Sequence, residues 1–310
     1  MNVKATILFL ILILTSCASE PTSVSNVSNH QNADIRAQRL LRQKDALVSF
    51  YQPMRVMDGD WLETQHEAGE TFDEYIASNP TLPTPERRTI YIQPIGTFDR
   101  GQIRVVQLAA EYIAAFYNLP VKINAAMRLG PVPKGKQRRI EWKNNLQIRT
   151  SYFLEDVLPD LLPNDAAALI AFTNYDLYPG DTWAFVFGQA TFSERVGVYS
   201  LYRLRGSDGR AGSDLFLDRT LKLAVHEVGH MFSMKHCVKF ECLMSGTNHL
   251  DETDRRPLDN CPECTAKAAW AMRYDLVERY RALAAFWQKM GRPLEARSMR
   301  EKSAAVDKIK

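Results

Sequence analysis

Apolar and polar positions in the first 87 residues indicate three segments that precede a folded domain. A run that is apolar except for Thr6 fills residues 5–14, directly after Lys4. Ser, Asn, Thr and Pro then dominate up to about residue 32, and so few apolar side chains cannot form a core. Apolar positions next recur at helical spacing and then thin out among aromatic, acidic and proline residues. We expect a leader at residues 1–16, a flexible tether at 17–35, and a helical extension at 36–87 that packs on the following domain.

After this extension the pattern becomes that of a folded α/β domain. Residues 89–123 predict a strand, a helix and a strand, because a β-branched stretch is followed by an amphipathic one and a second short apolar run. Apolar runs at 167–172 and 183–187 predict buried strands. Core-like spacings in the C-terminal part predict helices to the end. The expected fold class is α/β, or α+β, with a mixed sheet, and the domain spans residues 88–300.

The candidate catalytic residues follow four apolar residues, Leu221, Leu223, Ala224 and Val225, in a His-Glu-Val-Gly-His stretch that begins at His226. On a helix, positions four apart share a face, so His226 and His230 can direct their rings at one ion. Glu227 lies about a quarter-turn away, where a general base for a hydrolytic water must sit. His236 adds a third ligand and leaves one position open, as in a catalytic zinc site. The pattern also arises by chance on solvated helices, but the apolar approach and the third histidine favour a buried site.

Four cysteines follow the third histidine as two close pairs. Cys237 and Cys242 form the first pair, and Cys261 and Cys264 form the second, as Cys-Pro-Glu-Cys. Two close thiol pairs favour a structural tetrathiolate zinc site with no open position. Such a site would pin the segment after His236 to the C-terminal part of the domain. Two disulfides are the alternative, since an exported protein works in an oxidising compartment.

These motifs together resemble the archaemetzincins, a family of metzincin-type zinc metallopeptidases, and the animal members more closely than the short archaeal ones. The resemblance extends through Cys242-Leu243-Met244 and residues 248–258, and it covers most of residues 88–290. It implies a zincin fold in which the three histidines bind the catalytic zinc and Glu227 is the base. It also implies a second zinc on the four cysteines, and it makes Met244 the methionine of a Met-turn beneath the site.

One position departs from the pattern of the family. Members usually carry glycine three residues after the second histidine, where the chain leaves the helix sharply, and this chain carries Ser233. A left-handed conformation costs a non-glycine residue about 1–2 kcal/mol. We expect either compensation from the neighbouring cysteine site or a turn that is built differently.

The apolar run near the N-terminus ends in a Leu-Thr-Ser-Cys motif at Cys17, which is typical of a bacterial lipoprotein signal. A helix of about ten residues spans about half of a bilayer core, so a signal peptide is favoured over a transmembrane helix. Ala18 and Ser19 are not acidic, as in lipoproteins sorted to an outer membrane. We expect lipidation of Cys17 and attachment to the membrane of the bacterial cell envelope, facing the periplasm. An ordinary cleaved signal with an incidental cysteine is the alternative.

Two other polar features indicate solvent exposure. The stretch 129–145 is basic, but a net charge of +3 over 310 residues gives no general field for a polyanion, so we expect no nucleic-acid partner. The pair His66-Glu67 in the extension lacks a second histidine and is expected at the surface.

We therefore expect a zinc-dependent peptidase that hydrolyses peptide bonds of peptide or protein substrates, with water activated by Glu227. A strand within residues 185–190 is expected to hold an extended peptide through main-chain hydrogen bonds. Tyr199, Tyr202 and His249 are candidates to stabilise the oxyanion. The alternative is a zinc-containing lipoprotein that binds peptides without cleaving them.

Overall fold

The computed structural model describes residues 24–140, 145–205 and 213–309. The expected leader and Cys17 lie outside the described residues, so lipidation stays a prediction. Of the helices in the described part of the chain, none is long and apolar enough to cross a membrane.

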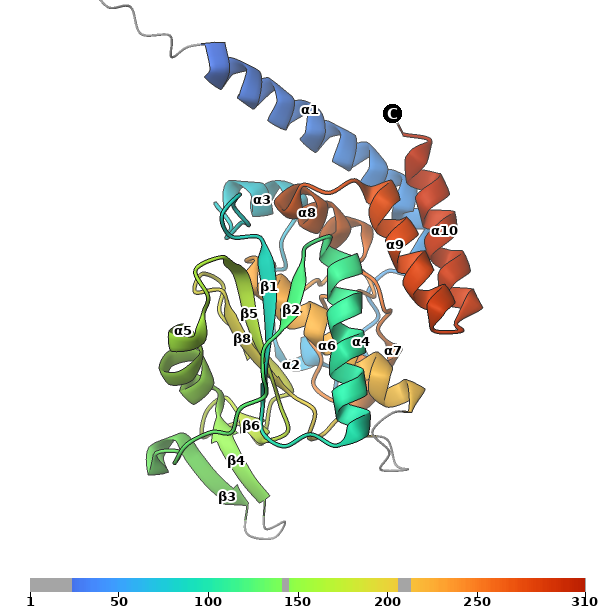
Figure 1. The fold of residues 1–310 in the computed structure, drawn as a ribbon. Coiled ribbons are helices and arrows are strands. Elements are labelled where there is room, and N and C mark those ends of the chain that lie inside the picture. The colour runs from blue at the N-terminus through green and yellow to red at the C-terminus, as the bar shows by residue number, and fades with distance from the viewer. Residues whose placement is uncertain (1–23, 141–144, 206–212, 310) are drawn as a thin grey trace, which may run out of the picture.

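A five-stranded sheet in the order β2-β1-β5-β8-β7 forms the centre of the domain (Figure 1). Its strands are β1 (Thr89–Ile95), β2 (Val121–Ile123), β5 (Ala166–Thr173), β7 (Gly188–Ala190) and β8 (Val196–Ser200). Four of them are parallel, and β7 runs antiparallel to β8 at one edge. The strands β1, β5 and β8 are buried along their whole lengths, because both faces of the sheet are covered. The sheet is mixed, as the sequence predicts.

Alternate residues of these strands face two separate hydrophobic cores. Ile92 and its register partner Ile170 face the larger core, which also contains residues of α4 and α6. Tyr91 and Leu169 face the smaller core, which η4 and α5 complete. The bounds of these helices are α4 (Arg100–Tyr117), η4 (Tyr152–Val157, a π-helical turn), α5 (Leu158–Leu161) and α6 (Asp214–Met231). The side chain of Ser213 caps the first turn of α6, which fixes where the histidine-bearing helix begins.

The remaining elements surround this centre (Figure 1). A small sheet has the order β3-β4-β6, and it consists of β3 (Gln137–Ile140), β4 (Asn145–Arg149) and β6 (Asp176–Tyr178), with η2 (Lys134–Lys136) before it. The C-terminal helices are α7 (Leu250–Arg255), α8 (Pro262–Met272), α9 (Leu276–Lys289) and α10 (Pro293–Asp307). The pair α9 and α10 packs on α4 and on α1.

Helix α1 (Val24–Leu47) begins inside the segment that was expected to be a tether. Residues 24–35 are therefore helical, and the expectation of a flexible coil was wrong for them. Leu40 and Leu47 are buried in the larger core, and α1 contacts α8 and α10. Once packing has formed the C-terminal turns, adding further turns needs no new nucleation, so even a polar sequence can continue the helix.

The chain from residue 51 to 71, called the strap below, runs over the segments that follow the third histidine. Its neighbours are η1 (Val48–Phe50) and α3 (Phe72–Ala77), and it contains α2 (Trp61–Thr64). The backbone N–H of Met54 donates to the carbonyl of Lys239 at 3.0 Å. The backbone N–H of Trp61 donates to the carboxylate of Glu252, also at 3.0 Å. The strap is thus joined to the domain by hydrogen bonds along its length.

The strand predicted at residues 183–187 is absent, and β7 begins only at Gly188. The carbonyls of Trp183 and Ala184 accept hydrogen bonds from the guanidinium of Arg138, and Ala184 also accepts one from Gln147. Side chains thus satisfy these two carbonyls, while Val186 forms an isolated β-bridge to Leu177 of β6. Its apolar residues form the wall of a cleft, and Trp183 is 38% exposed.

A buried ionic network joins the start of the strap to the C-terminal helices. Asp259 accepts hydrogen bonds from Arg279 at 2.7 Å, from Lys302 at 2.9 Å and from the hydroxyl of Tyr51 at 2.7 Å. Burial alone would raise the pKa of Asp259, but the charges of Arg279 and Lys302 hold it well below its usual range. The carboxylate is therefore ionised in the folded protein at neutral pH.

Replacing Asp259 by Asn should lower the free energy of unfolding by about 3–5 kcal/mol, because it leaves Arg279 and Lys302 buried without their counter-charge. Urea denaturation at pH 7 measures this change. Because the pKa is lower in the folded state, the stabilisation is present at neutral pH and is lost as the pH falls below about 4. The control is Glu111→Gln, which breaks an exposed ion pair with Lys289 and should change stability by less than about 1 kcal/mol. Equal effects of the two variants would contradict the role of the network.

Candidate metal centres

The last turns of α6 and the loop that follows bring the three predicted histidine ligands together. His226 and His230 stand one turn apart, with ring centroids separated by 4.6 Å. The ring of His236 lies 5.2 Å from that of His226 and 4.9 Å from that of His230. One nitrogen from each of the three rings lies within 4.8 Å of the other two, so a single ion could contact all three.

Backbone carbonyls set the orientation of the two helix histidines. The Nδ1 of His226 lies 3.0 Å from the carbonyl of Leu243, and the Nδ1 of His230 lies 2.7 Å from that of Met234. A carbonyl can only accept, so each Nδ1 carries the proton and each Nε2 of a neutral ring keeps a lone pair.

The donor set fits a zinc ion. The two Nε2 atoms lie 3.0 Å apart, where two lone pairs would face each other without a proton between them. Burial and the nearby His236 lower the pKa of His226 to about 3, and burial holds the pKa of His230 well below its usual range. Neutral imidazoles that converge in this way are the donors that zinc prefers, and a cation between them removes the repulsion of the lone pairs.

Glu227 is buried beside the histidines, and within the described part of the chain no counter-charge pairs with it. Its Oε2 has no hydrogen-bond partner among the described residues, and burial raises its pKa to about 8. Gly188 of β7 gives it room, because a Cβ at that position would collide with Oε1. A buried carboxylate without a partner is costly, and this one lines the same cleft as the three histidines.

Met244 packs directly beneath the histidine helix. A Cβ at Gly229 would come within 2.5 Å of its sulfur, so the glycine between the two helix histidines is required for this contact. Met244 is fully buried, and its carbonyl accepts the N–H of Cys237 at 2.8 Å. The methionine therefore packs against the histidine helix and is bonded to the residue next to His236.

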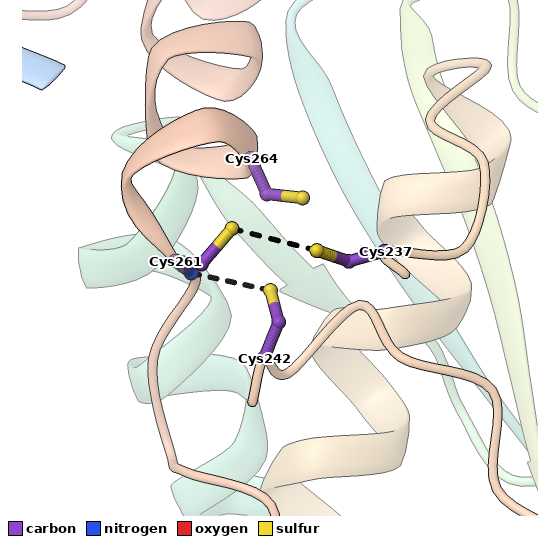
Figure 2. A group of neighbouring side chains, drawn as sticks. All are labelled: Cys237, Cys242, Cys261 and Cys264. Carbon is purple, nitrogen blue, oxygen red and sulfur yellow. Dashed lines mark hydrogen bonds between the residues drawn. The ribbon is translucent and has the colours of Figure 1, made fainter. Parts of the chain in front are cut away.

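The four cysteines form a compact buried cluster (Figure 2). Each of the four is free, and their sulfur atoms lie within 4.8 Å of one another. The sulfur of Cys242 accepts the backbone N–H of Met244 at 3.4 Å and that of Cys261 at 3.1 Å. Four convergent sulfurs with N–H donors directed at one of them fit a tetrathiolate metal site better than two disulfides.

Ser233 adopts the left-handed conformation, with φ of 62°. The hydrogen bonds that could compensate for this backbone strain are made by its own side chain and not by the cysteine site. The Oγ donates to the carbonyl of Phe192 at 2.7 Å and accepts the N–H of Thr81 at 2.9 Å. The ring of Phe192 packs on His230 with centroids 5.4 Å apart. The serine thus ties one wall of the cleft to the turn after the histidine helix, which a glycine could not do.

A cleft of about 730 Å³ opens in front of the histidines. Residues Gly188, Gln189 and Ala190 of β7 line one side, and among the described strands β7 pairs only with β8. Trp61 of the strap stacks on Trp183 with centroids 6.0 Å apart and forms an aromatic wall. The cleft therefore combines a free strand edge with apolar surfaces.

The three residues suggested for the oxyanion lie away from the lining of this cleft. The Tyr199 hydroxyl is buried near Glu227, and Tyr202 lies on another part of the surface, near Asp99. His249 caps α7 and lies 3.5 Å from Asp60. These three suggestions therefore gain no support.

Two site residues were missed. Glu67 is at the surface, as expected, and both of its carboxylate oxygens lie 2.9 Å from Nδ1 of His236. Trp61 packs edge-on against the same ring, with centroids 5.4 Å apart. Both residues come from the strap, far from the motif in sequence, so no local spacing could have indicated them.

Comparison with known proteins agrees with this geometry. The model of peptidase family M54 matches residues 154–269. Archaemetzincin-2 of Macaca fascicularis is 36% identical over 301 residues, which cover 83% of this chain and 80% of the relative. Archaemetzincin-2 of Mus musculus is 34% identical over 296 residues, with the same coverage of 83% and 80%. The crystal structure of an archaemetzincin from Methanopyrus kandleri has a TM-score of 0.51 at 24% identity and covers 62% of this chain and 99% of its own.

The fold, the histidine site and these matches define a zinc metallopeptidase, a hydrolase that acts on peptide or protein substrates. Within that class the chain belongs to the archaemetzincin family. The family predicted from the motifs is confirmed.

Replacing Ser233 by Ala should lower the free energy of unfolding by about 1–2 kcal/mol, because it removes two hydrogen bonds and keeps the backbone strain. Ser233→Gly loses the same bonds but relieves the strain, so it should be less destabilising than the alanine variant. Chemical denaturation of the three proteins gives the comparison. An alanine variant as stable as the unchanged chain would show that the bonds to Phe192 and Thr81 do not compensate for the strain.

Proposed function

We propose that His226, His230 and His236 hold the catalytic zinc and that Glu227 is the general base of peptide-bond hydrolysis. The observation that carries the proposal is the buried, unpartnered carboxylate beside three converging imidazoles. When bound there, zinc supplies Lewis-acid chemistry, since it acidifies water and polarises a carbonyl group.

Glu227 moves the proton in this proposal. Burial raises its pKa to about 8 without metal, and a cation on the histidines would favour the ionised carboxylate, the form that can take a proton. It accepts the proton of the attacking water and passes it to the amine that leaves. The absence of a competing hydrogen bond on Oε2 within the described part of the chain keeps that oxygen free for the transfer.

The substrate is proposed to lie along β7 as an extended strand. The free edge of Gly188, Gln189 and Ala190 offers main-chain donors and acceptors beside the histidines. Main-chain pairing would hold peptides of varied sequence in one direction, while the wall formed by Trp61 and Trp183 would favour large apolar side chains.

We also propose that the cell envelope is where this enzyme works, attached through Cys17. Support comes from the apolar run that ends in the lipoprotein-type motif. The start of α1 projects from the body of the domain, which suits a spacer between membrane and enzyme (Figure 1).

Replacing Glu227 by Gln should lower the rate of peptide cleavage at least about 100-fold while zinc remains bound, because the amide cannot accept the proton. An unbiased peptide library digested by each protein and analysed by mass spectrometry gives the rates. The control Glu86→Gln, an exposed carboxylate outside the cleft, should cleave like the unchanged chain. If Glu227→Gln cleaved as fast as the unchanged chain, another group would be the proton acceptor. An unchanged chain that binds zinc and peptide but cleaves nothing would point to a binding role.

The full chain should contain two zinc ions, one on the histidines and one on the cysteines. Cys264→Ser should retain one, because a tetrathiolate site loses much of its affinity with one ligand removed. His230→Ala should also retain one, now on the cysteines. Metal analysis after dialysis gives the counts. A single zinc in the unchanged chain, together with loss of free thiols, would indicate that the cysteines form disulfides.

A further inference from the structure

The third histidine differs from the other two in what holds its Nδ1. Backbone carbonyls of the adjacent loop hold His226 and His230. The Nδ1 of His236 instead donates to the Glu67 side chain, whose two oxygens both lie at 2.9 Å. Glu67 lies 169 residues earlier in the chain, outside the region that matches the peptidase family.

Anchors on both sides of Glu67 fix the position of the strap. On one side, Asp60 forms an ion pair with Arg255 at 2.6 Å. On the other side, Lys267 donates to the carbonyl of Glu70 at 2.6 Å and to its carboxylate at 3.0 Å. Both Lys267 and Glu70 are almost completely buried. A carboxylate between two such anchors has little freedom to leave the histidine.

The strap also lies in close contact with the residues that follow His236. Gly69 has φ of 70°, and a Cβ there would come within 2.5 Å of a methyl carbon of Val238. The ring of Trp61 meets the ring of His236 edge-on, at an interplanar angle of 84°. The strap thus constrains both the plane of the histidine and its N–H group.

We infer that Glu67 is a positioning residue for His236. Its carboxylate holds the proton on Nδ1, turns the ring so that Nε2 faces the other two histidines, and makes that nitrogen a stronger donor to a metal ion. This inference rests on the proposed role of His236 as a zinc ligand. It makes the N-terminal extension a working part of the active site.

The pair stands at the mouth of the cleft, where the Glu67 side chain is 32% exposed and that of His236 is 19% exposed. Substitution of Glu67 therefore opens no large cavity in a core. The variant Glu67→Gln keeps the size of the side chain and removes the charge. Asp58→Asn is the matched control, since Asp58 is an exposed carboxylate of the same strap that lies outside the cleft.

The test is titration of the metal-free full chain with cobalt(II), in which visible bands of the histidine site and thiolate charge-transfer bands of the cysteine site are followed separately. Glu67→Gln should weaken binding at the histidine site by about 10- to 100-fold. Binding at the cysteine site and the midpoint of thermal unfolding should stay unchanged. Asp58→Asn should match the unchanged chain at both sites. Peptide cleavage by Glu67→Gln should recover as zinc is raised to saturation.

Three outcomes would contradict either this inference or the proposed function, and each can be told apart from the others. If Glu67→Gln binds cobalt at the histidine site as tightly as the unchanged chain, Glu67 does not position His236. If both sites weaken together and the unfolding midpoint falls, the strap has only a structural role. If the unchanged chain binds no metal at the histidines while the cysteine site fills, the proposed function itself fails.

Discussion

The conformation of one loop, residues 232–244, determines whether the histidine site can exist. Carbonyls of Met234 and Leu243 hold the rings of His230 and His226, so each ring is oriented only as well as the backbone that faces it. Hydrogen bonds weaken steeply with distance and angle, and a loop that moved would release both rings. His236 lies on the same loop, so all three candidate ligands depend on it.

Three constraints from separate parts of the chain hold this loop. At its start, the side chain of Ser233 bonds to the loop that carries Phe192. At its end, Met244 packs into the space left by Gly229 of the helix. Between them the cysteine cluster ties the loop to α8, and α8 in turn is bonded to the strap through Lys267. The N-terminal extension and the C-terminal helices therefore help to form a site whose three candidate ligands lie in neither of them.

The parts of the site that are local in sequence could be predicted, and the non-local parts could not. Helical periodicity places His226 and His230 on one face, and close cysteine spacing indicates a cluster, so both were found from residues alone. The partner of His236 was missed because Glu67 reaches it only through the path of the strap. The apolar run at 183–187 predicts a strand but forms a cleft wall, because apolar residues line both kinds of structure equally well.

The ionised form of Glu227, the candidate base, destabilises the metal-free fold, and a bound metal ion can offset this cost. Glu227 is only 4% exposed, and burial raises its pKa from 4.5 to about 8. At about 1.4 kcal/mol per pKa unit, its ionised form destabilises the metal-free fold by roughly 5 kcal/mol, fully so only above about pH 8. A cation on the histidines would favour the ionised carboxylate and remove much of that cost, so metal binding and folding are coupled. The burial that places Glu227 beside the histidines is thus also what makes the fold less stable without metal.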